Sequence, residues 1–259
     1  MIRFKNVSVT YRGGVQALRN LNLTIDKGEF VVIVGLSGAG KSTMLRSVNG
    51  LVPASSGSIT VEETEVVNAS AAEIRNLRSG IGMIFQTFNL VNRTSVINNV
   101  LMGRLGRVPA WRSTLGLWSA DDRERAMQAL ERVGIVEKAW VRASNLSGGQ
   151  QQRVGIARAL VQEPSVMLAD EPVASLDPVT SRQVMSDLRR INRELGITTL
   201  INLHYLDLAQ EFGGRLVGLR NGELVFDGDV REVDDQTFME IYGRAITDQD
   251  LVGEADSSI

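Results

Sequence analysis

The sequence predicts an α/β fold: a core built on a parallel sheet, a small antiparallel sheet at the amino end and a helical subdomain. The first observation is Phe30–Val34, an unbroken apolar run that is mostly β-branched, as in parallel strands buried on both faces. A glycine-rich loop and a helix-forming segment that starts at Lys41 follow it directly. Further apolar runs at residues 81–85, 166–169 and 198–202 have the length of buried strands.

The elements before this core are strands. Apolar and polar residues alternate from Ile2 to Val9 and again from Leu21 to Ile25. Turn signals stand at Gly13-Gly14 and at Lys27-Gly28. These segments supply the small antiparallel sheet.

The elements after residue 90 are mainly helical. The pattern from about residue 90 to 160 predicts the helical subdomain, with one helix near Arg125–Val133. Asp177-Pro178 is an N-cap followed by a proline at the first helical position, which predicts a helix from there to about Leu195. Asn221-Gly222 between apolar runs predicts a tight hairpin. We expect one domain over residues 1–244 and a polar carboxy-terminal tail over 245–259.

Composition excludes several classes of protein. A length of 259 residues, with 43% hydrophobic and 22% charged residues, suits a globular chain with a sizeable core. The net charge of -2 gives no electrostatic argument for nucleic acid. The absence of cysteine excludes disulfides and thiolate metal sites. No apolar run approaches 18 residues and no signal peptide is recognisable, so we expect a soluble, cytoplasmic chain that reaches a membrane only through partners.

The glycine-rich loop predicts a site for a nucleoside triphosphate with Mg²⁺. Residues 35–42 fill every fixed position of the G-x-x-x-x-G-K-[ST] pattern. Glycines let successive backbone N–H groups point at one anion, the lysine adds a charge near the β- and γ-phosphates, and the serine hydroxyl can ligate Mg²⁺. The residues expected to bind the nucleotide here are Gly35, Ser37, Gly38, Ala39, Gly40, Lys41, Ser42 and Thr43.

Two adjacent acids end the third apolar run. Asp170 and Glu171 follow residues 166–169, at the end of a buried strand. Beside the glycine-rich loop of residues 35–42, here called the phosphate loop, the aspartate can hold Mg²⁺ through water, and the glutamate can polarise the attacking water. An Asp-Glu pair alone is more often a helix cap or a surface pair, so the assignment depends on its occurring together with the loop.

A second glycine-rich motif restricts the family. Leu146-Ser147-Gly148-Gly149-Gln150 resembles the signature of the ATP-binding-cassette (ABC) ATPases, and the stretch from Leu168 to Pro178 resembles their second nucleotide motif with the loop that follows it. The resemblance covers Ile2 to about Asp229. It implies a P-loop ABC nucleotide-binding domain that binds ATP in a head-to-tail dimer, where Ser147, Gly148, Gly149 and Gln150 of one copy close over the nucleotide of the other.

The same resemblance assigns three more residues. His204, the only histidine, matches the family's γ-phosphate contact, although a lone histidine is more often structural. Gln86 matches the glutamine that reaches Mg²⁺ and the attacking water. Tyr11 matches the aromatic residue on which adenine stacks, with a half-buried strand tyrosine as the alternative. Lys41, Gln86, Glu171 and His204 are therefore the expected catalytic residues, and Ser42, Gln86 and Asp170 the expected Mg²⁺ ligands.

A finer resemblance, carried by residues 100–107, 111–113 and 170–177, is to ATP-binding subunits of bacterial phosphonate importers. It implies integral membrane permease partners, an extracytoplasmic phosphonate-binding protein as an indirect partner, and a peripheral position on the cytoplasmic face of the inner membrane. Three alternatives stay open: an importer of another kind, such as the polar amino-acid or lipoprotein type, an accessory subunit of a phosphonate-degrading complex, and an ABC ATPase that acts on nucleic acid or ribosomes.

The segment 101–118 is a candidate docking surface for the membrane subunits. It contains Arg104, Arg107 and Arg112, two tryptophans and no acidic residue. Arginine and aromatic side chains often anchor interfaces. The other interpretation is a solvated helix face over core aromatics.

Overall fold

The computed structural model describes residues 1–245, 247 and 250–252. Within this part of the chain the strands fall into two sheets. The four-stranded sheet has the order β2-β1-β4-β5 and its paired strands are antiparallel. The six-stranded sheet has the order β10-β9-β3-β8-β7-β6; it is parallel except for the β9–β10 hairpin.

The strands predicted at residues 2–9, 21–25, 30–34, 166–169 and 198–202 are present, although β2 begins earlier, at Gln16, and β4 and β5 were not predicted. Residues 81–85 form a strand only as far as Ile84, and the hairpin turn lies at Asn221-Gly222. The strands are β1 (Ile2–Thr10), β2 (Gln16–Ile25), β3 (Phe30–Val34), β4 (Ser56–Val61), β5 (Thr64–Glu65), β6 (Ile81–Ile84), β7 (Val166–Asp170), β8 (Thr198–Asn202), β9 (Arg215–Arg220) and β10 (Glu223–Asp229).

Five of the described α-helices, α2, α5, α6, α7 and α9, begin at a side-chain N-cap. Asp177 caps α7 through Thr180 N, with Pro178 at the first helical position, as predicted. The α-helices are α1 (Lys41–Val48), α2 (Ala71–Ser79), α3 (Val96–Leu101), α4 (Ala110–Thr114), α5 (Ala120–Arg132), α6 (Gly148–Leu160), α7 (Pro178–Leu195), α8 (Leu206–Phe212) and α9 (Asp235–Tyr242). Short 3₁₀ turns are η1 (Met102–Gly106), η2 (Val136–Lys138), η3 (Ala143–Asn145) and η4 (Val230–Glu232).

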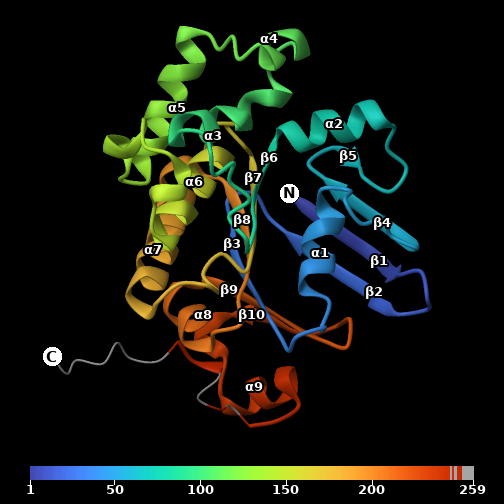
Figure 1. Cartoon of the computed structure of the whole chain (residues 1–259). Coiled ribbons are helices and arrows are strands. Elements are labelled where there is room, and N and C mark those ends of the chain that lie inside the picture. The colour runs from blue at the N-terminus through green and yellow to red at the C-terminus, as the bar shows by residue number, and fades with distance from the viewer. Residues whose placement is uncertain (246, 248–249, 253–259) are drawn as a thin grey trace, which may run out of the picture.

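Strand β3 divides the core into two layers. Phe30, Val32 and Val34 point into an apolar cluster with α6 and α7, whereas Val31 and Ile33 point into a second cluster with α1 and the antiparallel sheet. Figure 1 shows the parallel sheet between these two layers. Burial on both faces explains why β3 is apolar at every position.

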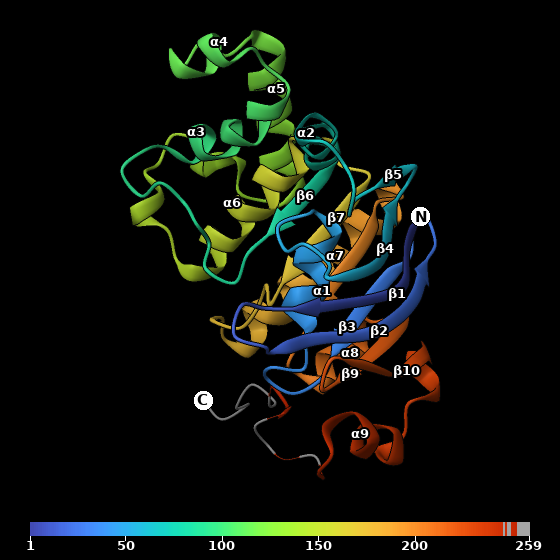
Figure 2. The same ribbon diagram turned by 90° about the vertical axis from the view of Figure 1, so that its right-hand side faces the viewer.

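The helical subdomain lies at one end of the molecule. Helices α3, α5 and α6 pack against one another, and with α4 they stand at the end opposite α8 and α9 in both views (Figures 1 and 2). Because α6 also packs on α7 and β6, the subdomain is continuous with the core.

The candidate docking segment 101–118 is partly buried and partly exposed. Arg104 fits neither a docking surface nor a solvated helix face. Arg104 is buried, 8% exposed, and its guanidinium donates to Asp122 Oδ1 at 3.0 Å, to Val161 O at 3.2 Å and to Glu163 Oε2 at 3.4 Å. Trp118 packs against the core, but Trp111 is 62% exposed. A buried carboxylate eighteen residues away attracts Arg104, and this partner is not apparent from the local sequence.

The end of the described chain is packed on the fold. Asp250 is 7% exposed, and Val252 packs against the core. Part of the predicted tail, residues 246, 248–249 and 253–259, lies outside the described residues. None of the described helices is long and apolar enough to cross a membrane.

Candidate functional site

Four neighbouring strands end at one edge of the sheet, and each is followed by a candidate residue. In the register of the sheet, Asn202 of β8 lies opposite Asp170 of β7 and Ile33 of β3, and β6 ends opposite Ala169. The phosphate loop follows β3, Glu171 follows β7, His204 follows β8 and Gln86 follows β6. Residues from four distant stretches of sequence therefore meet at the carboxyl edge, where ligands bind in parallel sheets.

A cavity of about 420 Å³ opens at this edge. All four strand ends contribute to its wall. The residues they supply are Gly35, Leu36, Ser37, Gln86, Glu171 and His204.

The phosphate loop has the tight backbone that its glycines allow. Gly35 has φ of +145°, and a Cβ at this position would lie 2.2 Å from Leu219 O on β9. Only glycine fits so close to a neighbouring backbone. Gly40 is the N-cap of α1, so the loop delivers the chain into the positive end of this helix.

Lys41 is held under the loop by backbone carbonyls. Its Nζ donates to Gly35 O at 2.6 Å and to Leu36 O at 3.2 Å, and the residue is 4% exposed. Burial lowers the pKa of Lys41, although the carboxylates of Glu171 and Asp170 act against this effect. The ammonium group is thus poised at the loop, where an arriving phosphate would compete for it.

Asp170 is the centre of a hydrogen-bonded group at the first turn of α1. Its Oδ1 accepts from Ser42 Oγ at 2.7 Å and from Asn202 Nδ2 at 2.8 Å, and its Oδ2 pairs with Arg46 at 3.0 Å. The Oδ1 of Asn202 is buried, and no hydrogen-bond partner for it lies among the residues that the structure describes. Buried polar atoms are normally satisfied, so a ligand or water is needed next to this amide.

These oxygen atoms suit Mg²⁺. A hydroxyl and a carboxylate already in contact match its preference for oxygen ligands from one or two carboxylates together with substrate phosphates. Among the described residues, no three His, Asp or Glu side chains cluster as a complete metal site. A metal held here would consequently need the phosphates as further ligands.

Glu171 and His204 contact each other across the cavity. Glu171 Oε1 lies 2.6 Å from His204 Nε2. This hydrogen bond, with help from the nearby Lys41 and Arg46 charges, lowers the pKa of Glu171 although burial opposes the effect. Glu171 also has a positive φ of 53°, which costs a residue with a side chain about 1 kcal/mol.

Tyr11 lies beside the first turn of α1. It follows β1, is 43% exposed, and its hydroxyl lies 3.1 Å from Thr43 Oγ1. An exposed ring at this position leaves a face for stacking next to the phosphate loop.

The signature residues do not line the cavity of their own chain. Ser147 is exposed and caps α6 in a reciprocal capping box with Gln150, so the helix begins at Gly148. Gly149 packs against α7, where a Cβ would lie 2.4 Å from Thr180 Cγ2. The structure thus brings together Gln86, Glu171, His204 and the phosphate loop, and presents residues 147–150 elsewhere on the surface.

Besides Arg244 and Asp250, which also line the cavity, sequence reasoning missed two residues that contact Asp170, Arg46 and Asn202. Both had a usable signal. Arg46 stands four positions after Ser42, on the same face of α1, and Asn202 is a polar residue at the end of a buried strand, two positions before His204.

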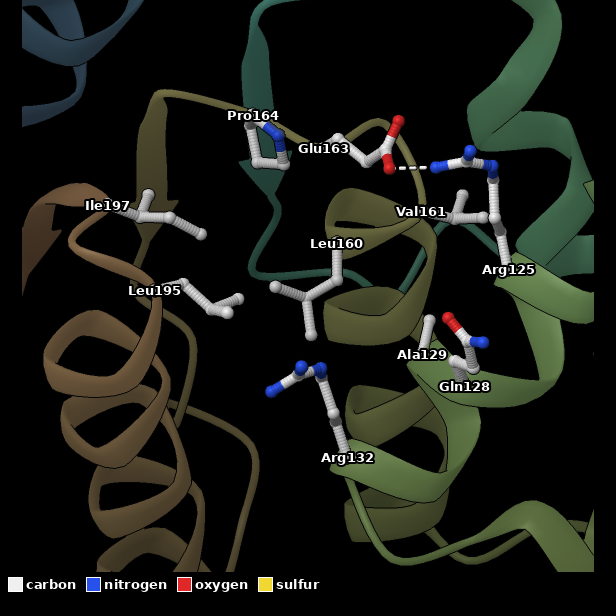
Figure 3. Close-up of a pocket in the computed structure, with 10 residues that line it drawn as sticks. All are labelled: Arg125, Gln128, Ala129, Arg132, Leu160, Val161, Glu163, Pro164, Leu195 and Ile197. Atoms are coloured by element: carbon white, nitrogen blue, oxygen red, sulfur yellow. Dashed lines mark hydrogen bonds and ion pairs between the residues drawn. The ribbon is translucent and has the colours of Figure 1, made fainter.

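A second cavity, of about 310 Å³, lies between α5, α6 and the end of α7 (Figure 3). Its floor is apolar, with Leu160 and Ile197, and its Arg125 is paired with Glu163. It contains none of the candidate residues, so it is separate from the site described above.

Comparison with known proteins gives one consistent result. The ABC transporter family matches residues 18–174. The chain is 58% identical over 254 residues to the phosphonates import ATP-binding protein PhnC of Shouchella clausii, covering 98% of this chain and 96% of that protein. It is 57% identical over 252 residues to the protein of the same name from Staphylococcus aureus, covering 97% of this chain and 98% of that protein.

Comparison with solved structures finds ATP-binding cassettes as well. The ATP-binding cassette MJ0796, a dimer in a post-hydrolysis state bound to ADP and Pi, is 35% identical with a TM-score of 0.78, covering 90% of this chain and 100% of that one. The cbiO1 protein of Clostridium perfringens, part of the transporter complex cbiONQ, is 32% identical with a TM-score of 0.79, covering 89% of each chain.

Proposed function

This chain belongs to the ABC transporter family of ATP-binding proteins, and we propose that it is the ATP-hydrolysing subunit of a bacterial phosphonate importer. The observation that carries the proposal is the meeting of Gln86, Glu171, His204 and the phosphate loop around one cavity. Relatives named as phosphonates import ATP-binding proteins, matched over nearly the whole chain, support the substrate class.

The reaction is ATP + H₂O → ADP + phosphate. Backbone N–H groups of residues 35–42 and the Lys41 ammonium hold the phosphates. Glu171 polarises the attacking water: its carboxylate is ionised at neutral pH, since its pKa lies below the ordinary value, and it can accept a hydrogen bond from water. His204, which contacts Glu171 in this structure, would turn its Nε2 to the γ-phosphate, and Gln86, which lines the same cavity, would orient the water.

Mg²⁺ is the expected companion of the nucleotide. Ser42 and Asp170 would hold it, and Gln86 would reach it from the end of β6. When bound, the metal would neutralise charge on the β- and γ-phosphates. Asn202 and Arg46 hold the Asp170 carboxylate in the orientation that this role requires.

A second copy of the chain completes each site. None of the signature residues lines this cavity. Ser147, at the N-terminus of α6, is exposed and can contact a nucleotide bound to a second copy of the chain. Two copies arranged head to tail would place each Ser147–Gln150 segment over the nucleotide of the other. The dimeric structures of the MJ0796 cassette, one of them bound to ADP and Pi, support a dimer of this chain.

Permease subunits are the proposed membrane partners, and they hold the chain at the cytoplasmic face of the inner membrane. The exposed residues of the 101–118 segment, Trp111 and Leu115 above all, form the proposed docking surface, from which Arg104 is removed because it is buried. An extracytoplasmic phosphonate-binding protein would deliver substrate to the permease, so this chain would never touch the phosphonate.

Growth on a phosphonate tests the proposal. In a bacterial strain lacking this gene, the wild-type chain should restore growth with methylphosphonate as sole phosphorus source, and Glu171→Gln should not. Both strains should grow equally on inorganic phosphate. Equal growth of the two complemented strains on methylphosphonate would refute the motor role.

A further inference from the structure

We propose that Arg244, in the segment that follows α9, is a phosphate-binding residue of the nucleotide cavity, and that Asp250 holds its guanidinium in place. Its ligand is the terminal phosphate of ATP. The inference rests on the proposed function, because it adds a contact to that same site.

The first step is position. Arg244 and Asp250 both line the cavity that Ser37, Glu171 and His204 line. Since Glu171 is the residue that polarises the attacking water, this end of the cavity receives the terminal phosphate. Arg244 is the single lysine or arginine among the described residues of its wall.

The second step is preorganisation. Arg244 donates from Nη1 and Nη2 to the two carboxylate oxygens of Asp250, at 2.7 and 2.8 Å. The guanidinium also lies over the ring of Tyr242, 6.0 Å from its centre. One edge and one face of the guanidinium plane are therefore fixed, which lowers the entropy lost when an anion binds.

The third step is anchoring of the segment. Thr247 donates to Asp250 Oδ2 from its backbone N at 2.8 Å and from Oγ1 at 3.0 Å. Val252 N donates to Asp207 Oδ1 at 3.1 Å. The Tyr242 hydroxyl approaches His204 O at 3.5 Å, so the same segment adjoins the loop that carries the catalytic histidine.

The fourth step is charge and access. The cavity wall carries two carboxylates, of Glu171 and Asp250, and the Lys41 ammonium lies on loop carbonyls outside this wall. The Asp250 side chain is 8% exposed, whereas that of Arg244 is 41% exposed. Arg244 is thus the partner within reach of a ligand, and its Nε makes no hydrogen bond in the described residues. Asp250 takes the Nη1–Nη2 edge, and Nη1 also donates to Ala245 O at 2.9 Å and to Thr247 Oγ1 at 3.4 Å. A phosphate would therefore bind at the Nε–Nη2 edge, where the planar guanidinium can still donate to two oxygens at once.

The test compares ATP with ADP, because only ATP has the terminal phosphate. Dissociation constants are measured for the wild-type chain, Arg244→Gln, Arg244→Lys and Asp250→Asn. Arg244→Gln should weaken ATP binding about tenfold, as expected for a lost charge-assisted hydrogen bond, and ADP binding by less than about twofold. Arg244→Lys should recover part of the loss because it keeps the charge.

Asp250→Asn separates ligand binding from a merely structural ion pair. Removing the carboxylate frees the guanidinium from its holder but keeps its charge, so ATP affinity should fall by less than in Arg244→Gln and ADP affinity should change little. Equal losses of ATP and ADP affinity in Arg244→Gln and Asp250→Asn would overturn the inference. If Arg244→Gln fails to fold, the ratio of ATP to ADP affinity in Arg244→Lys decides, and an unchanged ratio overturns it. A wild-type chain that binds no ATP would instead contradict the proposed function.

Discussion

Glu171 Oε1 lies 2.6 Å from His204 Nε2, although thirty-three residues separate the two in sequence. The contact joins the ends of β7 and β8. It holds the carboxylate of Glu171, the proposed general base, against the imidazole of His204. In the proposed mechanism, a γ-phosphate would give His204 a second anionic partner and so free the Glu171 carboxylate for water.

Replacing Glu171 with glutamine should stop turnover without preventing ATP from binding. The amide cannot polarise water as the carboxylate does, and the phosphate contacts of the loop are untouched. We expect steady-state hydrolysis to fall about 10²–10⁴-fold while the dissociation constant for ATP changes little. Glu223→Gln, on exposed β10, is the matched control and should hydrolyse ATP normally. Turnover of Glu171→Gln within about threefold of wild type would disprove the assignment of the general base.

Two inactive variants should form an active site together. Lys41→Ala lacks a phosphate anchor but keeps the signature, and Ser147→Arg blocks the signature but keeps the phosphate loop. A mixed dimer has one intact composite site, so it should trap ATP and hydrolyse it at a fraction of the wild-type rate. The measurement is nucleotide-trapped heterodimer between differently tagged chains.

Ser119→Arg is the control for the lost helix cap. Ser119 caps α5 in the same kind of capping box that Ser147 makes at α6. Each substitution should cost about 1 kcal/mol of folding stability, but only Ser147→Arg should block hydrolysis. If the two inhibit equally, Ser147 acts through helix stability alone.

The exposed apolar residues of the helical subdomain should be needed for assembly and not for catalysis. Trp111 is 62% and Leu115 67% exposed, and neither lies in the cavity. Trp111→Ala with Leu115→Ala should reduce co-purification with the permease subunits and phosphonate uptake, and leave ATP binding unchanged. Trp140→Ala, which removes another exposed tryptophan, 70% exposed, should assemble normally. Normal uptake in the double variant would show that this surface is a solvated helix face and not a docking surface.

Arg104→Ala should destabilise the fold rather than disturb docking. Its removal leaves the Asp122 carboxylate buried without its main cation, so we expect a loss of about 2–4 kcal/mol in the free energy of unfolding. Arg132→Ala breaks an exposed pair with Glu194 and should cost less than about 1 kcal/mol. Chemical denaturation at pH 7 measures both.

The effect of Arg104→Ala should depend on pH. Burial opposes ionisation of Asp122, but hydrogen bonds from Ser119 and Arg104 outweigh it and lower the pKa of this carboxyl. The ionised carboxylate therefore stabilises the fold above its unfolded-state pKa of about 4, and the contribution is lost as pH falls below it. The difference between Arg104→Ala and wild type should be constant from pH 5 to 7 and shrink toward pH 3; a difference independent of pH would exclude the ion pair as its cause.

The parts of the fold that could be predicted are those governed by neighbours in sequence. The apolar run Phe30–Val34, the loop at Gly35 to Ser42, the Asp177-Pro178 cap and the Asn221-Gly222 turn all act through backbone geometry and side-chain periodicity within a few residues. The ABC signature at Ser147 is recognisable for the same reason. The capping box of Ser147 and Gln150, also local, starts α6 at Gly148.

The tertiary structure decided which of these local units meet. The order β3-β8-β7-β6 places Gln86, Glu171 and His204 on one cavity, joins Asp170 to Asn202 and Arg46, and seats Arg244 and Asp250 beside the catalytic residues. It also buries Arg104, which its acid-free neighbourhood in sequence suggested as a surface residue. Local sequence determines how each segment folds, but strand order and ion pairs between distant segments depend on the free energy of packing the whole chain, which no short stretch of residues contains.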